Sequence, residues 1–201
     1  MVEAGERFLT AVDDPPGAPR LDDALAACAG VVAELQELSA KAGLGSGDLV
    51  VWIGDDPRMA LGARLSRARG CPTFTLGAAA EATLRLGDGP AAWGEALAVA
   101  AASAPGGFLE RRLFVARADP ALLEAALALA VPGTSVAIID GSGGGTLPAG
   151  ALASCRVLVA AGFGYHPDLV PEALATLRRE AALTEGLVAE GRGAPMTLVR
   201  R

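Results

Sequence analysis

The amino-acid sequence predicts an α/β fold, in which a doubly wound sheet of five, mostly parallel, strands is flanked by helices. Residues 49–53 (LVVWI) form a continuous apolar run, which is typical of a strand with both faces buried. Gly54 then allows a sharp turn, and Pro57 suits the first turn of a helix. The same unit of strand, turn and helix recurs along the chain, which favours right-handed crossovers between parallel strands.

The part before this strand is predicted to be mostly one long helix. Residues 13–19 (DDPPGAP) break regular structure after a short helix at 6–12, so residues 1–20 are expected to be a separate N-terminal segment. Over 21–42, apolar side chains repeat every three or four residues, which is the pattern of an amphipathic helix. Gly43 ends this helix in the usual C-terminal position.

Helices and strands alternate after the first strand. Asp55 or Asp56 can cap the helix that follows it, and Asp119 with Pro120 opens a later helix. The remaining strands are predicted at 72–76, 112–117, 135–140 and 156–161, and the helices between them at 59–69, 78–86, 91–104 and 121–130.

The last part of the chain carries weaker signals. Residues 146–153 are expected to form a weak helix or a turn, and a final helix runs from about 168 to 185. The tail 191–201 is predicted to be an added strand or an arm. These boundaries give a single domain over residues 21–190.

Composition excludes several classes of function. A net charge of −6 argues against a nucleic-acid groove, which needs clustered Lys and Arg. No apolar leader or long apolar run is present, which predicts a soluble cytoplasmic protein that does not enter a membrane. Cys28, Cys71 and Cys155 are far apart without a CxxC pair, so free, buried thiols and no metal site are expected.

Ligands of doubly wound sheets bind beyond the carboxyl ends of the strands, so the loops there are the candidate sites. The loop Gly141–Thr146 (GSGGGT) could cradle a phosphate with backbone N–H groups, or it could be a flexible turn. It lacks the GK[ST] of a Walker A loop, and its glycines have the wrong spacing for the dinucleotide fingerprint GxGxxG.

Two further features allow both a functional and a structural interpretation. His166 follows the last predicted strand, where it could act in acid–base chemistry or simply face solvent at the entry of a helix. Asp55 and Asp56 could form a catalytic or metal-binding pair, although a helix cap is the simpler interpretation. No GxSxG motif supports a Ser/His/Asp hydrolase.

The order of several motifs resembles the SIS (sugar isomerase) domain, and within it the phosphoheptose isomerase family. The stretches that carry the resemblance are Gly54–Arg58, Asp140–Pro148, Ala153–Val159 and Phe163–Leu174. The resemblance implies a sugar-phosphate site and an oligomer with sites between subunits. The ligand-binding residues that it implies are Gly54, Asp55, Gly141, Ser142, Gly143, Gly144, Thr146 and Asp168.

The chain departs from that family where its chemistry would be. The first phosphate-binding turn is Asp-Asp-Pro-Arg, and the second is replaced by residues 116–120 (ARADP). The helix Met59–Gly70 contains no carboxylate for the catalytic glutamate, and Leu174 stands at the position of the catalytic histidine. Isomerisation through an enediol needs an acid and a base, and neither is at its family position.

Two hypotheses follow from the resemblance. The favoured one is a non-catalytic or degenerate SIS protein, acting as a sugar-phosphate-binding or scaffold subunit of a homo-oligomer or of a hetero-oligomer with an active paralogue. The alternative is an active phosphosugar isomerase with relocated chemistry on His166 and Glu172. Neither hypothesis requires a cofactor, and the sequence names neither the sugar nor the partner.

Overall fold

The computed structural model describes residues 23–79, 82–103, 110–160, 167–180, 183, 187–190 and 197–200. The chain forms two compact units, Leu38–Gly162 and Met1–Glu37 with Phe163–Arg201. Helix α1 (Asp23–Lys41) spans the boundary between these residue ranges, and Gly43 follows it with a φ of +72°, as predicted for its C-terminal turn. No helix among the described residues is both long enough and apolar enough to cross a membrane.

The unit Leu38–Gly162 is built on one parallel sheet. Its six strands have the order β3-β2-β1-β4-β5-β6, and every neighbouring pair is parallel. This is the strand order of the Rossmann fold. The predicted doubly wound α/β fold is therefore confirmed, with one more strand than expected. The strands are β1 (Leu49–Ile53), β2 (Thr73–Gly77), β3 (Leu84–Arg85), β4 (Arg111–Arg117), β5 (Ser135–Asp140) and β6 (Arg156–Val159).

The additional strand, β3, lies in the stretch 78–86, for which the sequence predicted a helix. Thr75 and Thr83 hold this stretch against β2: the Thr75 N–H donates to Thr83 Oγ1 at 2.7 Å, and the Thr83 N–H donates to Thr75 Oγ1 at 3.0 Å. The helix prediction for 78–86 was wrong because helix propensity, even that of alanine, is a small preference per residue, and these contacts across the sheet outweigh it.

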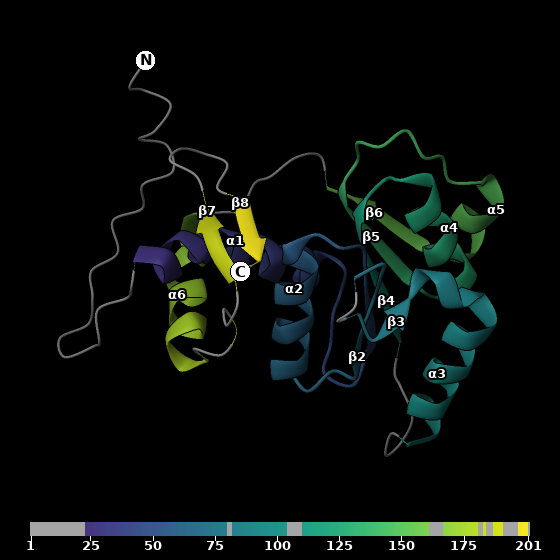
Figure 1. The fold of residues 1–201 in the computed structure, drawn as a ribbon, viewed down its shortest axis with the longest axis horizontal. Helices are drawn as coiled ribbons and strands as arrows, with labels where there is room; N and C mark the ends of the chain where they lie inside the picture. Colours follow the sequence, from purple (N-terminus) through teal and green to yellow (C-terminus); the bar gives the residue numbers. More distant parts are fainter. Residues whose placement is uncertain are drawn as a thin grey trace. The chain divides into compact units, whose positions relative to one another are not determined.

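Helices cover both faces of this sheet (Figure 1). Helix α2 (Pro57–Ala68) packs on one face against β1 and β2. On the opposite face lie α3 (Gly89–Ser103), which follows the short 3-10 helix η2 (Leu86–Asp88), and α4 (Pro120–Leu129). The last helix of this unit, α5 (Ala149–Ser154), has 6 residues, less than two turns, and precedes β6.

The core explains why the first strand has no polar alternation. All five residues of β1 are buried, because helices lie on both sides of it. Leu49, Val51 and Ile53 belong to the apolar cluster that includes the buried side chains of α3 and α4. Trp52 points to the other face and stacks on Phe114 of β4, with ring centroids 4.1 Å apart.

A buried ion pair lies near the amino end of the same strands. The Arg112 Nε donates to Asp48 Oδ2 at 2.9 Å, and these residues are 7% and 2% exposed. The Arg112 guanidinium also donates to Ser135 Oγ at 2.7 Å and pairs with Glu110 at 2.5 Å. This network fixes β4 against both neighbouring strands, and a pattern search of the sequence does not find it.

The other unit contains η3 (Pro167–Leu169), α6 (Val170–Arg179), and the hairpin of β7 (Leu187–Glu190) with β8 (Thr197–Arg200). The tail prediction is confirmed, since β8 pairs antiparallel with β7. Helix α6 is shorter than predicted, because Glu180 leaves helical geometry with φ −129° and ψ 66°. Helices α1 and α6 share a hydrogen bond from Gln36 Nε2 to Thr176 Oγ1 at 3.2 Å.

Candidate functional site

The candidate site is the carboxyl edge of the six-stranded sheet, where β1 and β4 lie side by side. The chain leaves β1 toward β2 on one side, while β4 and β5 lie on the other side, so this is the topological switch point of the fold. Loops after β1, β4 and β5 meet at this edge. Crevices at such switch points are where ligands of doubly wound sheets bind.

Gly54 makes the turn directly after β1, as predicted. Its φ is +122°, and a Cβ at this position would lie 2.7 Å from the Cβ of Ala116 on β4. The Gly54 N–H donates to the Leu76 carbonyl at 2.8 Å. Only glycine combines this backbone conformation with so close an approach to the neighbouring strand.

Asp56 caps α2, which confirms the structural interpretation of this residue. Its Oδ1 accepts the Arg58 N–H at 2.9 Å, and Pro57 occupies the first turn of the helix. The Arg58 guanidinium folds back onto the same carboxylate, with Nε at 2.9 and 3.0 Å and Nη2 at 2.5 Å. The negative charge of Asp56 is thus paired within its own turn.

Asp55 has different partners from Asp56, so the two carboxylates do not form a pair. Its two oxygens accept the N–H groups of Ala78 at 3.1 Å and Ala79 at 2.9 Å, just after β2. The carboxylate lies over Gly77, the last residue of β2, in space that a Cβ of residue 77 would enter. Asp55 is exposed to solvent at the carboxyl edge.

Two more carboxylates stand at the ends of β4 and β5. Asp119 caps α4 by accepting the Ala121 N–H at 3.0 Å, as the sequence predicted. Asp140 accepts the N–H and the hydroxyl of Ser142, both at 2.8 Å. The Ser142 N–H and then its hydroxyl lower the pKa of Asp140, and the charges of Arg58 and Arg117 act in the same direction.

The glycines of the loop Gly141–Thr146 approach the backbone between β4 and α4. A Cβ on Gly143 or Gly145 would lie 2.7 Å from the Ala118 carbonyl oxygen, which accepts the Gly145 N–H at 2.8 Å. Gly143 and Gly144 have φ values of +118° and +72°. Close packing therefore accounts for these glycines, and phosphate binding by Ser142, Thr146 and their neighbours stays a prediction.

The residues expected to carry relocated chemistry fall in the other unit or outside the described residues. Asp168 in η3 and Glu172 in the first turn of α6 are exposed residues of the other unit. Leu174 is buried in α6. His166 lies outside the described residues.

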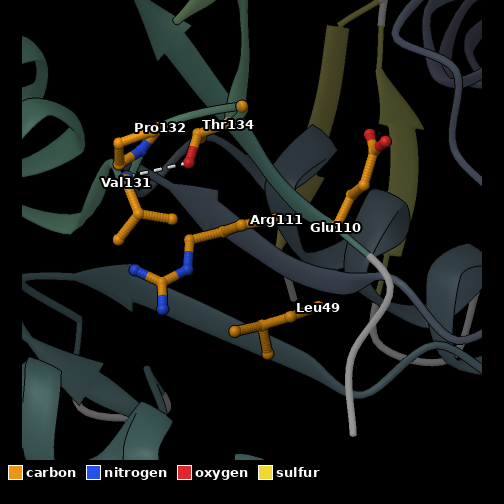
Figure 2. Close-up of a pocket in the computed structure, with 7 residues that line it drawn as sticks. Leu49, Glu110, Arg111, Val131, Pro132 and Thr134 are labelled. Carbon is orange, nitrogen blue, oxygen red and sulfur yellow. Dashed lines mark hydrogen bonds between the residues drawn. The ribbon is translucent and has the colours of Figure 1, made fainter. Parts of the chain in front are cut away.

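A cavity of about 380 Å³ lies at the opposite, amino end of the strands (Figure 2). Its polar groups already bind one another or the backbone. The Thr134 hydroxyl accepts the Val131 N–H at 2.9 Å, Arg111 donates to the Leu129 carbonyl, and Glu110 pairs with Arg112. Burial lowers the pKa of Arg111. Because the polar groups of this cavity already have partners, we place the candidate site at the carboxyl edge. The cavity is lined by Leu49, Glu110, Arg111, Val131, Pro132, Gly133 and Thr134.

The carboxyl edge differs from the dinucleotide fingerprint of Rossmann folds at the position that holds phosphate. When the first glycine of GxGxxG is aligned with Gly54, Asp56 stands at the position of the second glycine and Met59 at that of the third. The second glycine of the motif lets the backbone approach the pyrophosphate. The close approach of helix and strand assigned to the third glycine occurs one turn later, where Gly62 lies against Trp52. Since the Asp56 carboxylate occupies the anion position at the α2 N-terminus, a dinucleotide does not fit here in the fingerprint pose.

Metal-binding side chains are also not gathered in the part of the chain that the structure describes. Within those residues, no three His, Cys, Asp or Glu side chains lie close enough together to hold an ion. Cys28 and Cys71 are buried free thiols and Cys155 is a partly buried one. The described residues therefore do not fit a zinc site.

Comparison with known proteins identifies the fold. No family model and no curated protein matches the chain. Among solved structures, alcohol dehydrogenase TADH from Thermus sp. ATN1 aligns with a TM-score of 0.59 and 19% identity, over 82% of this chain and 50% of the dehydrogenase. Galactitol-1-phosphate dehydrogenase from Escherichia coli aligns with a TM-score of 0.60 and 16% identity, over 85% and 51%. A protein described as a zinc-binding dehydrogenase from Sinorhizobium meliloti 1021, bound to NADP, aligns with a TM-score of 0.58 and 20% identity, over 80% and 50%.

These comparisons correct the resemblance to SIS sugar isomerases. The similar structures are dehydrogenases, and neither a degenerate phosphosugar isomerase, a scaffold subunit of that family, nor an active isomerase with His166 and Glu172 fits them. The resemblance was wrong because it relied on the order of short glycine-rich turns, which many doubly wound sheets share at their strand ends. The chain spans about half the length of the dehydrogenases that it matches, and with them it shares the Rossmann fold.

Proposed function

We propose that this chain is the part of an oxidoreductase of the dehydrogenase class that binds the nucleoside of its ligand, at the carboxyl edge over β1 and β4. The observation that carries the proposal is the strand order together with the turn at Gly54 directly after β1. Sheets of this order bind nucleotides at that point. The alcohol and polyol dehydrogenases of similar fold support the class, and the NADP bound to one of the similar structures supports a ligand that contains a nucleoside.

Asp55 is the residue that we assign to the ribose. In dinucleotide-binding sheets an acidic residue at the end of the second strand accepts the ribose hydroxyls. Here that position is Gly77, and the Asp55 carboxylate lies above it. A carboxylate accepts about four hydrogen bonds, and the N–H groups of Ala78 and Ala79 take two of them. The other two directions can accept a ribose diol from the solvent side, because Asp55 is exposed.

Self-association is part of the proposal. Among the described residues β6 pairs with a strand only on its β5 side, and Val159 on this strand is 51% exposed. An open edge with an exposed β-branched side chain can pair with a strand of another molecule. Sedimentation velocity would measure the mass of the particle, and a monomer of about 20 kDa at micromolar concentration would remove this part of the proposal.

Calorimetric titration with adenosine tests the nucleotide site. We expect adenosine to bind, and 2′-deoxyadenosine to bind about tenfold more weakly because it lacks one hydroxyl donor to a charged acceptor. Asp55→Asn should weaken adenosine binding by a similar factor. The amide has one uncharged acceptor oxygen, which cannot accept both the backbone N–H groups and the ribose hydroxyls as the two carboxylate oxygens can. The control is Glu95→Gln on α3, an exposed carboxylate that should leave binding unchanged. No heat with adenosine, or equal affinity in Asp55→Asn, would contradict the proposal.

A further inference from the structure

The N-terminus of α2 carries an anion that belongs to the chain itself. The Asp56 carboxylate accepts the Arg58 N–H at 2.9 Å and both Nε and Nη2 of the Arg58 guanidinium. The Asp56 and Arg58 side chains are 29% and 13% exposed, so the pair is partly shielded from solvent. A helix N-terminus with a nearby arginine is a common combination for binding phosphate, and here a carboxylate holds both groups.

The charges at the carboxyl edge also oppose a phosphate. Four carboxylates stand at the carboxyl ends of β1, β4 and β5, and among the described residues of these ends two arginines accompany them. A pyrophosphate placed at the α2 N-terminus would have to displace Asp56 from Arg58 or lie beside it, and either arrangement brings negative charges together. The carboxylates are those of Asp55, Asp56, Asp119 and Asp140, and the arginines are Arg58 and Arg117.

The turn after β1 has the glycine that the packing of the fold requires, but it lacks the glycine that lets a phosphate approach the α2 N-terminus. Gly54 retains its positive φ and its contact with Ala116, and Gly62 provides the close approach of α2 to Trp52. Asp56 is the position where a charged side chain stands in place of the glycine that lies next to the phosphate in the dinucleotide fingerprint. The change therefore acts on ligand choice and leaves the packing of the sheet intact.

We propose that Asp56 determines specificity at this site: the chain takes a nucleoside whose 5′ substituent is neutral or cationic, and it excludes nucleotides with a 5′-phosphate or pyrophosphate. The identity of the nucleoside ligand rests on the proposed function above. The exclusion of phosphate rests on Asp56, Arg58 and the carboxylates around them, and it does not depend on the nucleoside. Removal of the Asp56 charge takes away the carboxylate that the Arg58 guanidinium contacts, so that the guanidinium can donate to an external anion.

Three adenosine derivatives that differ only at the 5′ position test the specificity of the wild-type protein in calorimetric titration. We expect 5′-amino-5′-deoxyadenosine, which is cationic, to bind at least as tightly as adenosine, and AMP to bind about tenfold more weakly. NAD⁺ should bind no better than AMP. Binding of AMP or NAD⁺ that is tighter than that of adenosine would overturn the inference.

Asp56→Ser tests the residue, because serine caps a helix as well as aspartate does but carries no charge. We expect this variant to bind inorganic pyrophosphate at least about tenfold more tightly than the wild type. Asp56→Ser combined with Arg58→Ala should lose the gain. Should Asp56→Ser fail to fold, Asp56→Asn removes the same charge with the same shape.

The matched control is Asp119→Ser, which makes the same substitution at the N-cap of α4, where Ala121 stands in place of an arginine. It should not improve pyrophosphate binding by more than about twofold, the effect of removing one exposed charge. An equal gain in Asp119→Ser, or no gain in either Asp56 variant, would overturn the inference. Because pyrophosphate has no ribose, these results do not depend on adenosine binding, whereas loss of adenosine binding alone would overturn only the proposed function.

Discussion

The indole ring of Trp52 lies against the α-carbon of Gly62, where α2 crosses β1. A Cβ on Gly62 would come within 2.5 Å of the ring, so no other residue fits there without movement. The indole Nε1 donates to Ser66 Oγ at 3.1 Å, one turn further along α2, and the Ser66 hydroxyl donates to the Gly62 carbonyl at 2.9 Å. This contact sets the distance between the helix and the sheet, and with it the position of the loop Gly54–Arg58.

Gly62→Ala should destabilise the protein. Alanine in a helix interior is favoured over glycine by about 1 kcal/mol, but forcing an extra carbon into a packed core costs about 1–3 kcal/mol. We expect the second effect to dominate and the free energy of unfolding to fall by about 1–2 kcal/mol in urea denaturation. Gly94→Ala on α3 is the control: nothing lies within 4 Å of its Cβ position, so it should raise stability. Equal effects of the two substitutions would show that Trp52 does not restrict Gly62.

Asp48→Ala should cost much more than the loss of an exposed ion pair. It removes the buried carboxylate from the Arg112 guanidinium, which keeps only Ser135 and the half-exposed Glu110 of these partners, and breaking a buried pair costs about 3–5 kcal/mol. Arg117→Ala is the comparison, because Arg117 is 61% exposed and lies 3.8 Å from Asp119, so its loss should cost less than about 1 kcal/mol. Denaturant unfolding at constant pH measures both. Similar losses would mean that the buried network does not hold β4 in place.

One of the three thiols should react quickly in the native protein. Cys28 is 1% exposed and Cys71 is 3% exposed, whereas Cys155 is partly exposed. Burial raises the pKa of the Cys28 thiol, and burial followed by the charge of Asp48 raises that of Cys71, so both hold little reactive thiolate at neutral pH. A thiol-specific colour reagent should modify about one equivalent before denaturation. Cys155→Ser should abolish this fast phase; if it persists, a buried cysteine is more accessible than the structure shows.

Stability should fall in acid partly because of Asp140. The Ser142 N–H and hydroxyl lower the pKa of this carboxyl below its ordinary value of 3.8. Since the folded-state pKa is below the unfolded one, the stabilisation is present above the unfolded value and is lost as the pH falls through the folded value. NMR titration of the Asp140 carboxyl should show the low pKa, and Ser142→Ala should raise it. An Asp140 pKa unchanged in Ser142→Ala would contradict this assignment.

The sequence by itself determined the local structure. Apolar runs predicted β1, β4, β5 and β6, and the Asp-Pro pairs at 56–57 and 119–120 predicted the starts of α2 and α4, which the structure confirms. These signals are local: a cap, a fixed proline φ or a buried strand is decided by residues within a few positions of one another.

Only the tertiary structure decided the order of the strands and the partners of the site residues. Asp55 binds N–H groups 23 and 24 residues away, and Arg112 binds a carboxylate 64 residues away, so no short motif encodes either contact. β3 forms because Thr83 meets Thr75 across the sheet, against the helix preference of the alanines that precede it. The dependence on long-range contacts also explains why the order of motifs suggested sugar isomerases. A glycine turn marks the end of a strand but does not determine which strand lies beside it. Long-range pairing decides that, and it places β1 beside β4 and Asp55 above Gly77.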